Sequence, residues 1–307
     1  MSFRYKDRGT ALHKLSPFCK LAWLVTIFVL SLVFDHPLYL LLLFLSTVLP
    51  VLAARVWREW LSFMKFALYL ALAIVIINAL VSQQGSHILW QAAFKIPVVG
   101  APLITLEAIV FGIGMVFRLL AIISAFVLFT FTVHPDDIMM AMIKLKLPFK
   151  SVMVASLSTR FVPTLIDDVE RIGAVQRSRG LELDRGKLTQ RIRGRMAIII
   201  PLLANSLDRT VQVAEAMESR AFGSGSRRTF YKKLELGKLD IPVLASSFLA
   251  LSLGIFMRVE GWGIYQYYPA LAKVNLDGLE TVVLSLLLLI LCLIVPLSFL
   301  KKRIELD

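Results

Sequence analysis

Residues 18–54 read FCKLAWLVTIFVLSLVF-DHP-LYLLLLFLSTVLPVLAA, two apolar runs of 17 residues separated by three. A helix of about 17–25 mostly apolar residues crosses the hydrocarbon core of a bilayer. Proline lacks the backbone donor that a helix interior needs, so the connecting tripeptide is a tight turn. The stretch therefore predicts two membrane helices, Phe18–Phe34 and Leu38–Ala54, that form a hairpin.

The rest of the chain contains further apolar runs of membrane-spanning length. Hydrophobic residues make up 58% of its 307 residues, whereas soluble domains contain about 45–50%. The mean hydropathy is +0.76. We expect four further membrane helices, at Leu61–Val81, Leu106–Val133, Ile241–Met257 and Leu279–Leu300. The fold class is therefore an all-α, polytopic membrane protein with about six transmembrane helices.

The formal net charge of +13 is distributed unevenly. If six helices alternate across the membrane, thirty of the 34 Lys and Arg residues fall on one side. Lys and Arg accumulate on the cytoplasmic side of membrane proteins. Both termini and residues 134–240 are therefore expected in the cytoplasm. The positive charge is explained by topology and predicts the lipid bilayer, and no nucleic acid, as a partner.

The chain is expected to contain three regions. Residues 1–133 hold membrane helices one to four, residues 134–240 form a cytoplasmic domain, and residues 241–307 hold the last two membrane helices and a basic tail. The cytoplasmic region contains three predicted helices: one that begins at His134-Pro135-Asp136-Asp137, one over 151–179 and one over 189–220. Gly180 suits the left-handed residue that ends the second of them.

The second and third of these helices end in the same kind of triplet. The two triplets are Ser178-Arg179-Gly180 and Ser219-Arg220-Ala221. An arginine near a helix C-terminus has a simple structural explanation, because it complements the negative end of the helix dipole. An arginine flanked by small residues also leaves its guanidinium open to carboxylates of a partner. The repetition favours docking onto two related surfaces.

Several motifs occur together in a fixed order. They are LHKLSP at 12–17, Arg118-Leu119-Leu120, TVHPDD at 132–137, RFVP at 160–163, QRSRG at 176–180 and AMESRAFG at 216–223. This set resembles the transmembrane T component of energy-coupling factor transporters, the family that includes the cobalt-transporter membrane subunit. In that family, Ala-Arg-Gly-like triplets end two long coupling helices. Here serine replaces the first residue of both triplets, and alanine replaces the last residue of the second.

The resemblance implies a function without catalysis in this chain. Ser178, Arg179, Gly180, Ser219, Arg220 and Ala221 would bind two ATPase subunits of the ABC type, identical or different. ATP and magnesium would be held by those subunits, and no cofactor or metal by this chain. A small substrate-binding membrane protein, the S component, would recognise a vitamin or a transition-metal ion. The location implied is the plasma membrane of a prokaryotic cell.

Other readings of the sequence remain open. There is no GxxxxGK[ST] phosphate loop, and the GxG formed by Gly112 and Gly114 lies inside a predicted span, where it favours close helix packing. An ion-coupled secondary transporter needs polar groups in mid-membrane, for which Asn78 and Glu107 are the candidates.

A membrane-embedded enzyme needs a chemical site, for which the adjacent carboxylates at 136–137 and 167–168 are the candidates. Adjacent residues point to different sides of a helix, which weakens this reading. Arg118, an intramembrane polar residue, has either a structural ion pair or a functional role.

Overall fold

The computed structural model describes residues 8–82, 85–91, 103–180, 188–225, 237, 239–272 and 277–304. The chain divides into two compact units. The first unit comprises Met1–Ile138 and Leu234–Asp307, and the second comprises Met139–Lys233. Each unit is considered by itself below.

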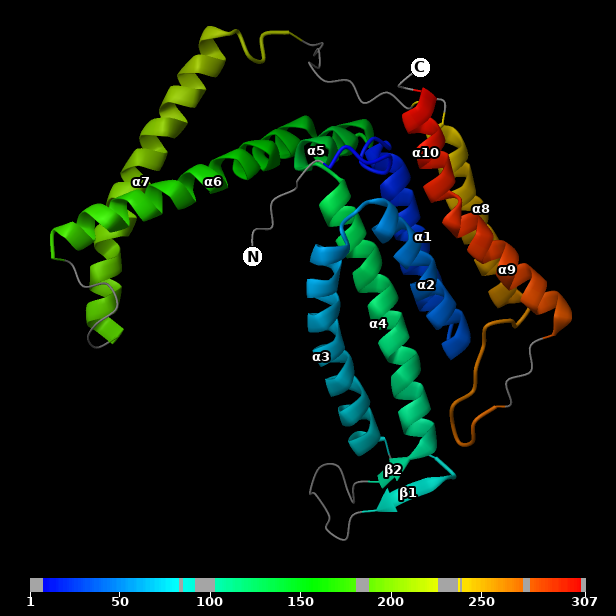
Figure 1. Ribbon diagram of the computed structural model, residues 1–307. Helices are drawn as coiled ribbons and strands as arrows, with labels where there is room; N and C mark the ends of the chain where they lie inside the picture. The colour runs from blue at the N-terminus through cyan, green and yellow to red at the C-terminus, as the bar shows by residue number, and fades with distance from the viewer. Residues whose placement is uncertain are drawn as a thin grey trace. The chain divides into compact units, whose positions relative to one another are not determined.

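The first unit is a bundle of apolar helices (Figure 1). Its helices are α1 (Pro17–Val33), α2 (Pro37–Ala53), α3 (Trp57–Val81), α4 (Leu106–Thr132), α8 (Asp240–Val259), α9 (Gly278–Cys292) and α10 (Ile294–Ile304). Each predicted span coincides with one of them, and the last span runs through α9 into α10. Among the described residues, four segments are long and apolar enough to cross a membrane: Trp57–Asn78, Leu106–Thr132, Asp240–Val259 and Gly278–Leu300. Helices α1 and α2 are apolar but shorter, at 17 residues each. The chain is therefore an all-α membrane protein.

The predicted hairpin of α1 and α2 is confirmed, and its turn is built from capping contacts. Pro37 is at the first position of α2, where its missing N–H costs no helical hydrogen bond. His36 caps the helix, because its Nδ1 accepts a hydrogen bond from the backbone N–H of Leu38 at 3.2 Å.

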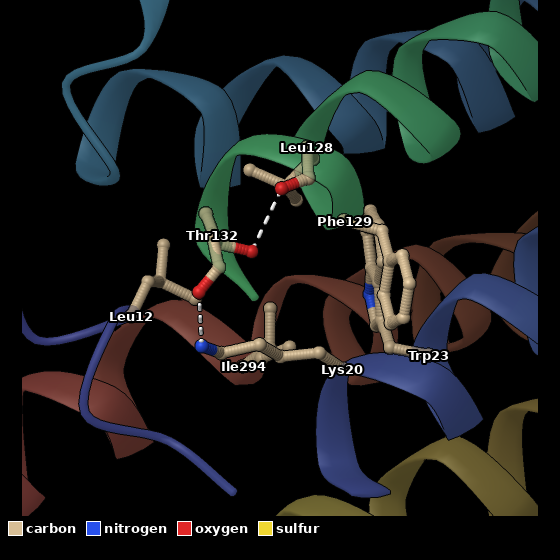
Figure 2. A pocket seen from close by; sticks show the side chains of 7 residues that line it. All are labelled: Leu12, Lys20, Trp23, Leu128, Phe129, Thr132 and Ile294. Atoms are coloured by element: carbon tan, nitrogen blue, oxygen red, sulfur yellow. Dashed lines mark hydrogen bonds between the residues drawn. The ribbon is translucent and has the colours of Figure 1, made fainter. Parts of the chain in front are cut away.

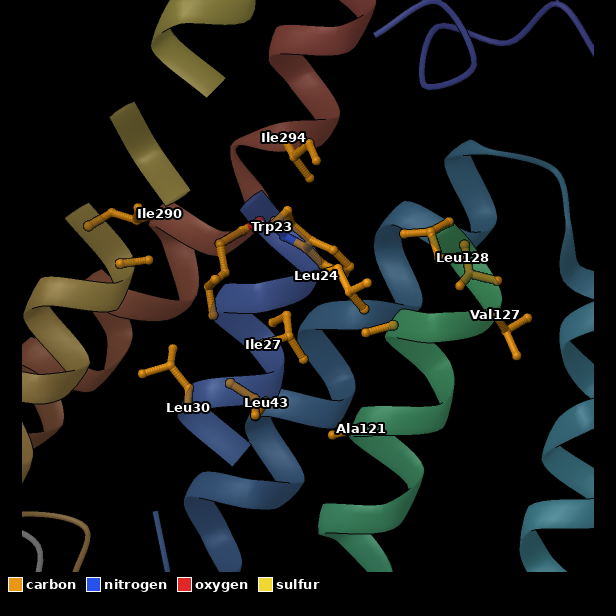
Figure 3. Close-up of a cluster of buried hydrophobic side chains, with 14 of the residues drawn as sticks. Trp23, Leu24, Ile27, Leu30, Leu43, Ala121, Val127, Leu128, Ile290 and Ile294 are labelled. Carbon is orange, nitrogen blue, oxygen red and sulfur yellow. Dashed lines mark hydrogen bonds between the residues drawn. The ribbon is translucent and has the colours of Figure 1, made fainter. Parts of the chain in front are cut away.

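The core of the first unit gathers around α1. Figure 3 shows side chains from several helices meeting at Ile27 and Leu30, both fully buried. Helix α1 packs against α4 and α8, and α2 packs against α4 and α9. A continuous apolar cluster connects these helices.

Glycines allow the closest helix contacts. A Cβ atom built on Gly112 would lie 3.3 Å from the Cα atom of Val75, so α3 and α4 approach there backbone to backbone. A Cβ atom on Gly114 would lie 2.6 Å from the hydroxyl of Tyr267. The interpretation of this GxG as a packing feature is confirmed. Gly254 of α8 likewise allows the side chain of Leu30 of α1 to pack directly against the backbone of α8.

Two short strands interrupt the helical pattern. Strand β1 (Ile88–Gln91) pairs antiparallel with β2 (Leu103–Thr105) between α3 and α4. The sequence analysis missed them, because a four-residue strand is too short to display a period of two. The hairpin is fixed to the start of α4 by a bond from the N–H of Leu106 to the carbonyl of His87 at 3.1 Å.

The second unit contains the predicted long helices. Helix α5 (Pro135–Lys144) begins in the first unit, and α6 (Phe149–Ser178) and α7 (Leu188–Ser219) follow in the second. Helices α6 and α7 approach each other at Gly173, where an added Cβ atom would lie 3.7 Å from Ile198 Cδ1, an ordinary packing distance. Near this contact, Gln176 Nε2 donates to the carbonyl of Ala197 at 3.3 Å.

Candidate functional site

The two triplets end α6 and α7 with the same backbone geometry. Gly180 has a φ of +83° and Ala221 a φ of +56°, so both residues are left-handed. The N–H of Gly180 donates to the carbonyl of Arg177, and that of Ala221 donates to Glu218. These bonds satisfy carbonyls that the helix end leaves free. The third residue of each triplet is therefore the C′ residue, which explains why it is small. For α7 this residue is Ala221, two positions before Gly223.

The serine of each triplet is bound to its own helix. Ser178 Oγ donates to the carbonyl of Val175 at 2.8 Å, and Ser219 Oγ donates to the carbonyl of Ala216 at 3.1 Å. Such bonds direct the hydroxyl back toward the preceding turn. Serine in place of alanine therefore leaves the space around the adjacent arginine open.

Arg179 and Arg220 occupy the C-cap positions between these residues. Both are exposed. Within the residues that the structure describes, neither guanidinium forms a hydrogen bond or an ion pair. Each arginine thus presents an unpaired planar fork, and such a fork binds carboxylates through two parallel hydrogen bonds.

The two arginines lie far from each other. The ring of Phe222, next to the second triplet, lies 6.4 Å from the ring of Phe149. Phe149 starts α6, and Arg179 caps its opposite end after 30 helical residues. Since a helix rises about 1.5 Å per residue, the triplets are separated by about 40 Å. Figure 1 shows the C-terminal ends of α6 and α7 well apart. A single small ligand cannot bridge them.

Asp168 joins α6 to α7. Its Oδ1 lies 2.6 Å from Arg171 of the same helix, and its Oδ2 lies 2.8 Å from Arg209 of α7. The side chain of Asp168 is only 7% exposed. Both carboxylate oxygens serve this ion-pair network, so a metal-binding role for the 167–168 pair is not supported by the geometry. Arg171 and Arg209 are therefore paired, in contrast to Arg179 and Arg220.

An apolar face of α7 is exposed in the part of the second unit that the structure describes. Ile200, Leu203, Leu207 and Val211 follow one side of the helix and are 55–65% exposed. On α6, Val162, Ile166 and Val169 are also exposed. Apolar stripes of this size on a helix mark a surface that a partner or lipid covers.

Arg118 has its partner in the α1–α2 turn. Its Nη2 lies 3.0 Å from Asp35 Oδ1 and donates to the carbonyl of Phe34 at 2.8 Å. Arg258, from the end of α8, binds the second oxygen of Asp35 at 3.0 Å. The Tyr267 hydroxyl donates to the carbonyl of Asp35 at 2.6 Å. Arg118 therefore forms a structural ion pair.

Lys20 binds the C-terminal end of α4. Its Nζ donates to the carbonyl of Thr132, the last residue of α4, at 2.7 Å, and to that of His13 at 3.0 Å. Figure 2 shows the ammonium group directed at Thr132. A small cavity surrounds it, lined by Leu12, Lys20, Trp23, Leu128, Phe129, Thr132 and Ile294. Lysine at a helix C-terminus satisfies free carbonyls. This contact joins the start of α1 to the helix that leads into α5.

Asn78 and Glu107, the candidates for ion coupling, both form hydrogen bonds within the first unit. Asn78 Nδ2 donates to the carbonyl of Ala108 at 2.9 Å, which ties α3 to α4. The buried carboxylate of Glu107 accepts hydrogen bonds from Ser86 Oγ at 3.0 Å and from the N–H of His87 at 3.1 Å. Both residues serve the α3–α4 connection.

The sequence patterns do not reveal the partners of three of these residues: Lys20, Asp35 and Asp168. Asp168 belongs to a carboxylate pair considered above as a chemical site, and the structure places it in an ion-pair network instead. A single acid between two spans, such as Asp35, with an arginine in a later span is a signal for an intramembrane pair. Lys20 lies inside an apolar run, which is a signal for a buried contact.

Comparison with known proteins places the chain among transporter subunits. Residues 8–231 match the family described as cobalt transport protein, CbiQ. The energy-coupling factor transporter transmembrane protein EcfT of Streptococcus thermophilus is 30% identical over 264 residues, which cover 82% of this chain and 96% of that protein. EcfT of Acidaminococcus fermentans is 27% identical over 269 residues, which cover 85% and 96%. EcfT of Bacillus subtilis is 27% identical over 260 residues, which cover 81% and 95%.

The family match includes the first four apolar helices, α1 to α4, and the two arginine-capped helices, and the relatives are covered almost from end to end. The motifs and the fold lead to the same conclusion. This chain belongs to the CbiQ family of cobalt transport proteins and is a relative of the transmembrane proteins of energy-coupling factor transporters.

Proposed function

We propose that this chain is the energy-coupling membrane subunit of an importer driven by ABC ATPases. Its first unit would lie in the membrane with both termini in the cytoplasm, and residues 134–240 would form the cytoplasmic coupling domain. The chain itself would bind no nucleotide and catalyse no reaction. The observation that carries the proposal is the pair of exposed, unpaired arginines, each fixed at a helix end by the same C-cap geometry.

Two ATPase subunits suit this arrangement better than one. The triplets share their backbone geometry, so each fits the same kind of acidic groove. Their separation of about 40 Å exceeds the diameter of a small domain, which is about 30 Å. Each arginine would therefore engage its own ATPase, through bidentate bonds to carboxylates at the groove.

The ion pairs of Asp168 support a mechanical role. They join α6 to α7 on a buried carboxylate, so a displacement of one helix end is transmitted to the other helix. ATP binding would draw the two ATPases together and move Arg179 and Arg220 with them. The long helices would act as levers on the membrane-embedded partner.

The uncovered apolar stripe offers the surface for that partner. Ile200, Leu203, Leu207 and Val211 lie on one side of α7, where the substrate-binding membrane protein would pack. Movement of α7 would then tilt or release that protein. It, and not this chain, would recognise the vitamin or transition-metal ion.

Co-purification tests this proposal. The Arg179→Ala/Arg220→Ala double variant, co-expressed with the neighbouring ATPase subunits, should reach the membrane in normal amounts but lose the ATPases during purification and fail to support uptake. Arg177→Ala and Arg195→Ala serve as matched controls, because both arginines are exposed on the same helices and their side chains lie outside the two triplets. Normal assembly and uptake in the double variant would refute the proposed coupling.

A further inference from the structure

Strand β1 exposes an unusual run of apolar side chains. Ile88, Leu89 and Trp90 are consecutive and are 56%, 58% and 53% exposed. In a regular strand, alternate residues face opposite sides, and one side packs on the protein. A bulge between Ile88 and Trp90 breaks this alternation. All three side chains are therefore left uncovered by the described part of the chain.

The base of this hairpin is held firmly. His87 and Ser86 are bound to the buried carboxylate of Glu107, at the first turn of α4. The N–H of Ser86 donates to the carbonyl of Pro269 at 2.9 Å. Across the strands, Trp90 is opposite Ile104, a pairing of aromatic and β-branched residues that stabilises a sheet. Strand β1 is therefore fixed in place by hydrogen bonds and strand pairing while its apolar side chains are exposed.

The length of α4 places the hairpin at a membrane boundary. Thr132 ends α4 beside Lys20, in the first turn of α1, so Leu106 lies at the opposite side of the bundle. The 27 residues of α4 extend about 40 Å. This exceeds the hydrocarbon thickness of about 30 Å and matches the thickness that includes the headgroups. The base of the hairpin thus lies at the level of the headgroups.

We propose that β1 is an interfacial anchor, whose Ile88, Leu89 and Trp90 side chains insert into the phospholipid leaflet on the side opposite the N-terminus of α1. Tryptophan is enriched at this depth, because its ring is apolar and its N–H finds a polar partner. Apolar side chains are exposed on α3 as well, where Ile76 and Ile77 are 49% and 60% exposed.

Lipid is favoured over a protein partner by the form of the surface. A protein that docks on a strand covers one side of it or extends its edge. Here a bulge interrupts the pairing, and three consecutive apolar side chains of one short strand are exposed. A fluid leaflet can cover such an uneven surface.

Tryptophan fluorescence in liposomes tests this proposal. The purified chain is reconstituted in phosphatidylcholine that carries bromine either near the headgroup or near the end of the acyl chain, and wild type is compared with Trp90→Phe. The difference in emission between wild type and Trp90→Phe is the contribution of Trp90. We expect bromine near the headgroup to quench this contribution about twofold more than bromine near the end of the acyl chain. Trp262→Phe is the matched control, because this half-buried residue lies on the same side and packs against Phe256. Its removal should leave the lipid-quenched component in place.

Two results would overturn the proposal. In the first, the Trp90 component is quenched by iodide in water as strongly as free tryptophan and is unaffected by brominated lipid, which places the strand in water. In the second, brominated lipid quenches Trp90 in the isolated chain but not in the assembled transporter, which makes β1 a docking surface for another subunit. Neither result depends on the arginine caps, so the proposed coupling function is tested separately.

Discussion

Arg118 Nη2 lies 3.0 Å from Asp35 Oδ1, so the middle of α4 is ion-paired to the turn between α1 and α2. Arg118 is 12 residues, or about 18 Å, from the start of α4. The turn reaches only this depth because α1 and α2 are shorter than α4 by 10 residues. The short α1–α2 hairpin thus places Asp35 at the depth of Arg118. The turn supplies the counter-ion for the arginine inside the span.

Replacement of Asp35 tests this relationship. Asp35→Asn leaves two arginines without a carboxylate, so we expect the bundle to lose about 2 kcal/mol of stability, the magnitude of hydrogen bonds to charged groups. The measurement is thermal unfolding in detergent. In the double variant Asp35→Asn/Arg258→Gln, one of the two positive charges is also removed, and part of the loss should be recovered. Additive losses would show that the three charges act independently.

A second prediction concerns the junction of α6 and α7. Asp168→Asn removes the charge that holds both Arg171 and Arg209, so amide hydrogen exchange should accelerate in α6 and α7 by about tenfold or more. Asp167→Asn is the matched control, because this neighbour is exposed and forms no contact with either arginine. Equal exchange in the two variants would exclude Asp168 as the link between the helices.

The helix caps predict stability changes of opposite sign for substitutions at two equivalent positions. Ala221 is left-handed, a conformation that costs an L-residue about 1–2 kcal/mol. Ala221→Gly should therefore stabilise the end of α7 by about 1 kcal/mol, and Gly180→Ala should destabilise the end of α6 by a similar amount. Chemical denaturation of the purified chain measures both. The same sign for both variants would contradict a shared cap geometry.

The sequence was sufficient to predict the helices and the ends of the arginine-capped pair. Long apolar runs define membrane helices almost independently of their neighbours, and a glycine such as Gly180 indicates a helix end locally. The partners of the charged residues depend on which helices pack together. Asp168 therefore could not be assigned to Arg209, which is 41 positions away, and Lys20 could not be assigned to Thr132.

The contact between Lys20 and Thr132 gives a prediction about coupling. Lys20→Met keeps an unbranched side chain but leaves the carbonyls of Thr132 and His13 without this donor, so the end of α4 should loosen. If the arginine caps bind the ATPases, this variant should still assemble with them, while uptake falls by about tenfold or more. Lys14→Met is the control, because Lys14 is an exposed lysine of the same segment. Normal uptake by Lys20→Met would exclude the contact from the coupling path.

The packing of α1 against α8 gives the last prediction. A Cβ atom on Gly254 would overlap Leu30 Cδ2 and would lie 3.4 Å from Leu287 Cδ1. Gly254→Ala should therefore force Leu30 to move and destabilise the bundle by about 1–3 kcal/mol, the usual cost of overpacking. Small residues let membrane helices approach closely, and this position has no spare volume.

A compensating change separates this steric cost from a general intolerance of alanine. Leu30→Ala empties the space that the new methyl group needs, so the double variant Gly254→Ala/Leu30→Ala should be more stable than the sum of the two single losses predicts. Gly278→Ala is the control, since nothing lies within 4 Å of the added methyl group. Thermal unfolding of the four variants completes the comparison. A strictly additive double variant would mean that α1 and α8 do not meet through Leu30 and Gly254.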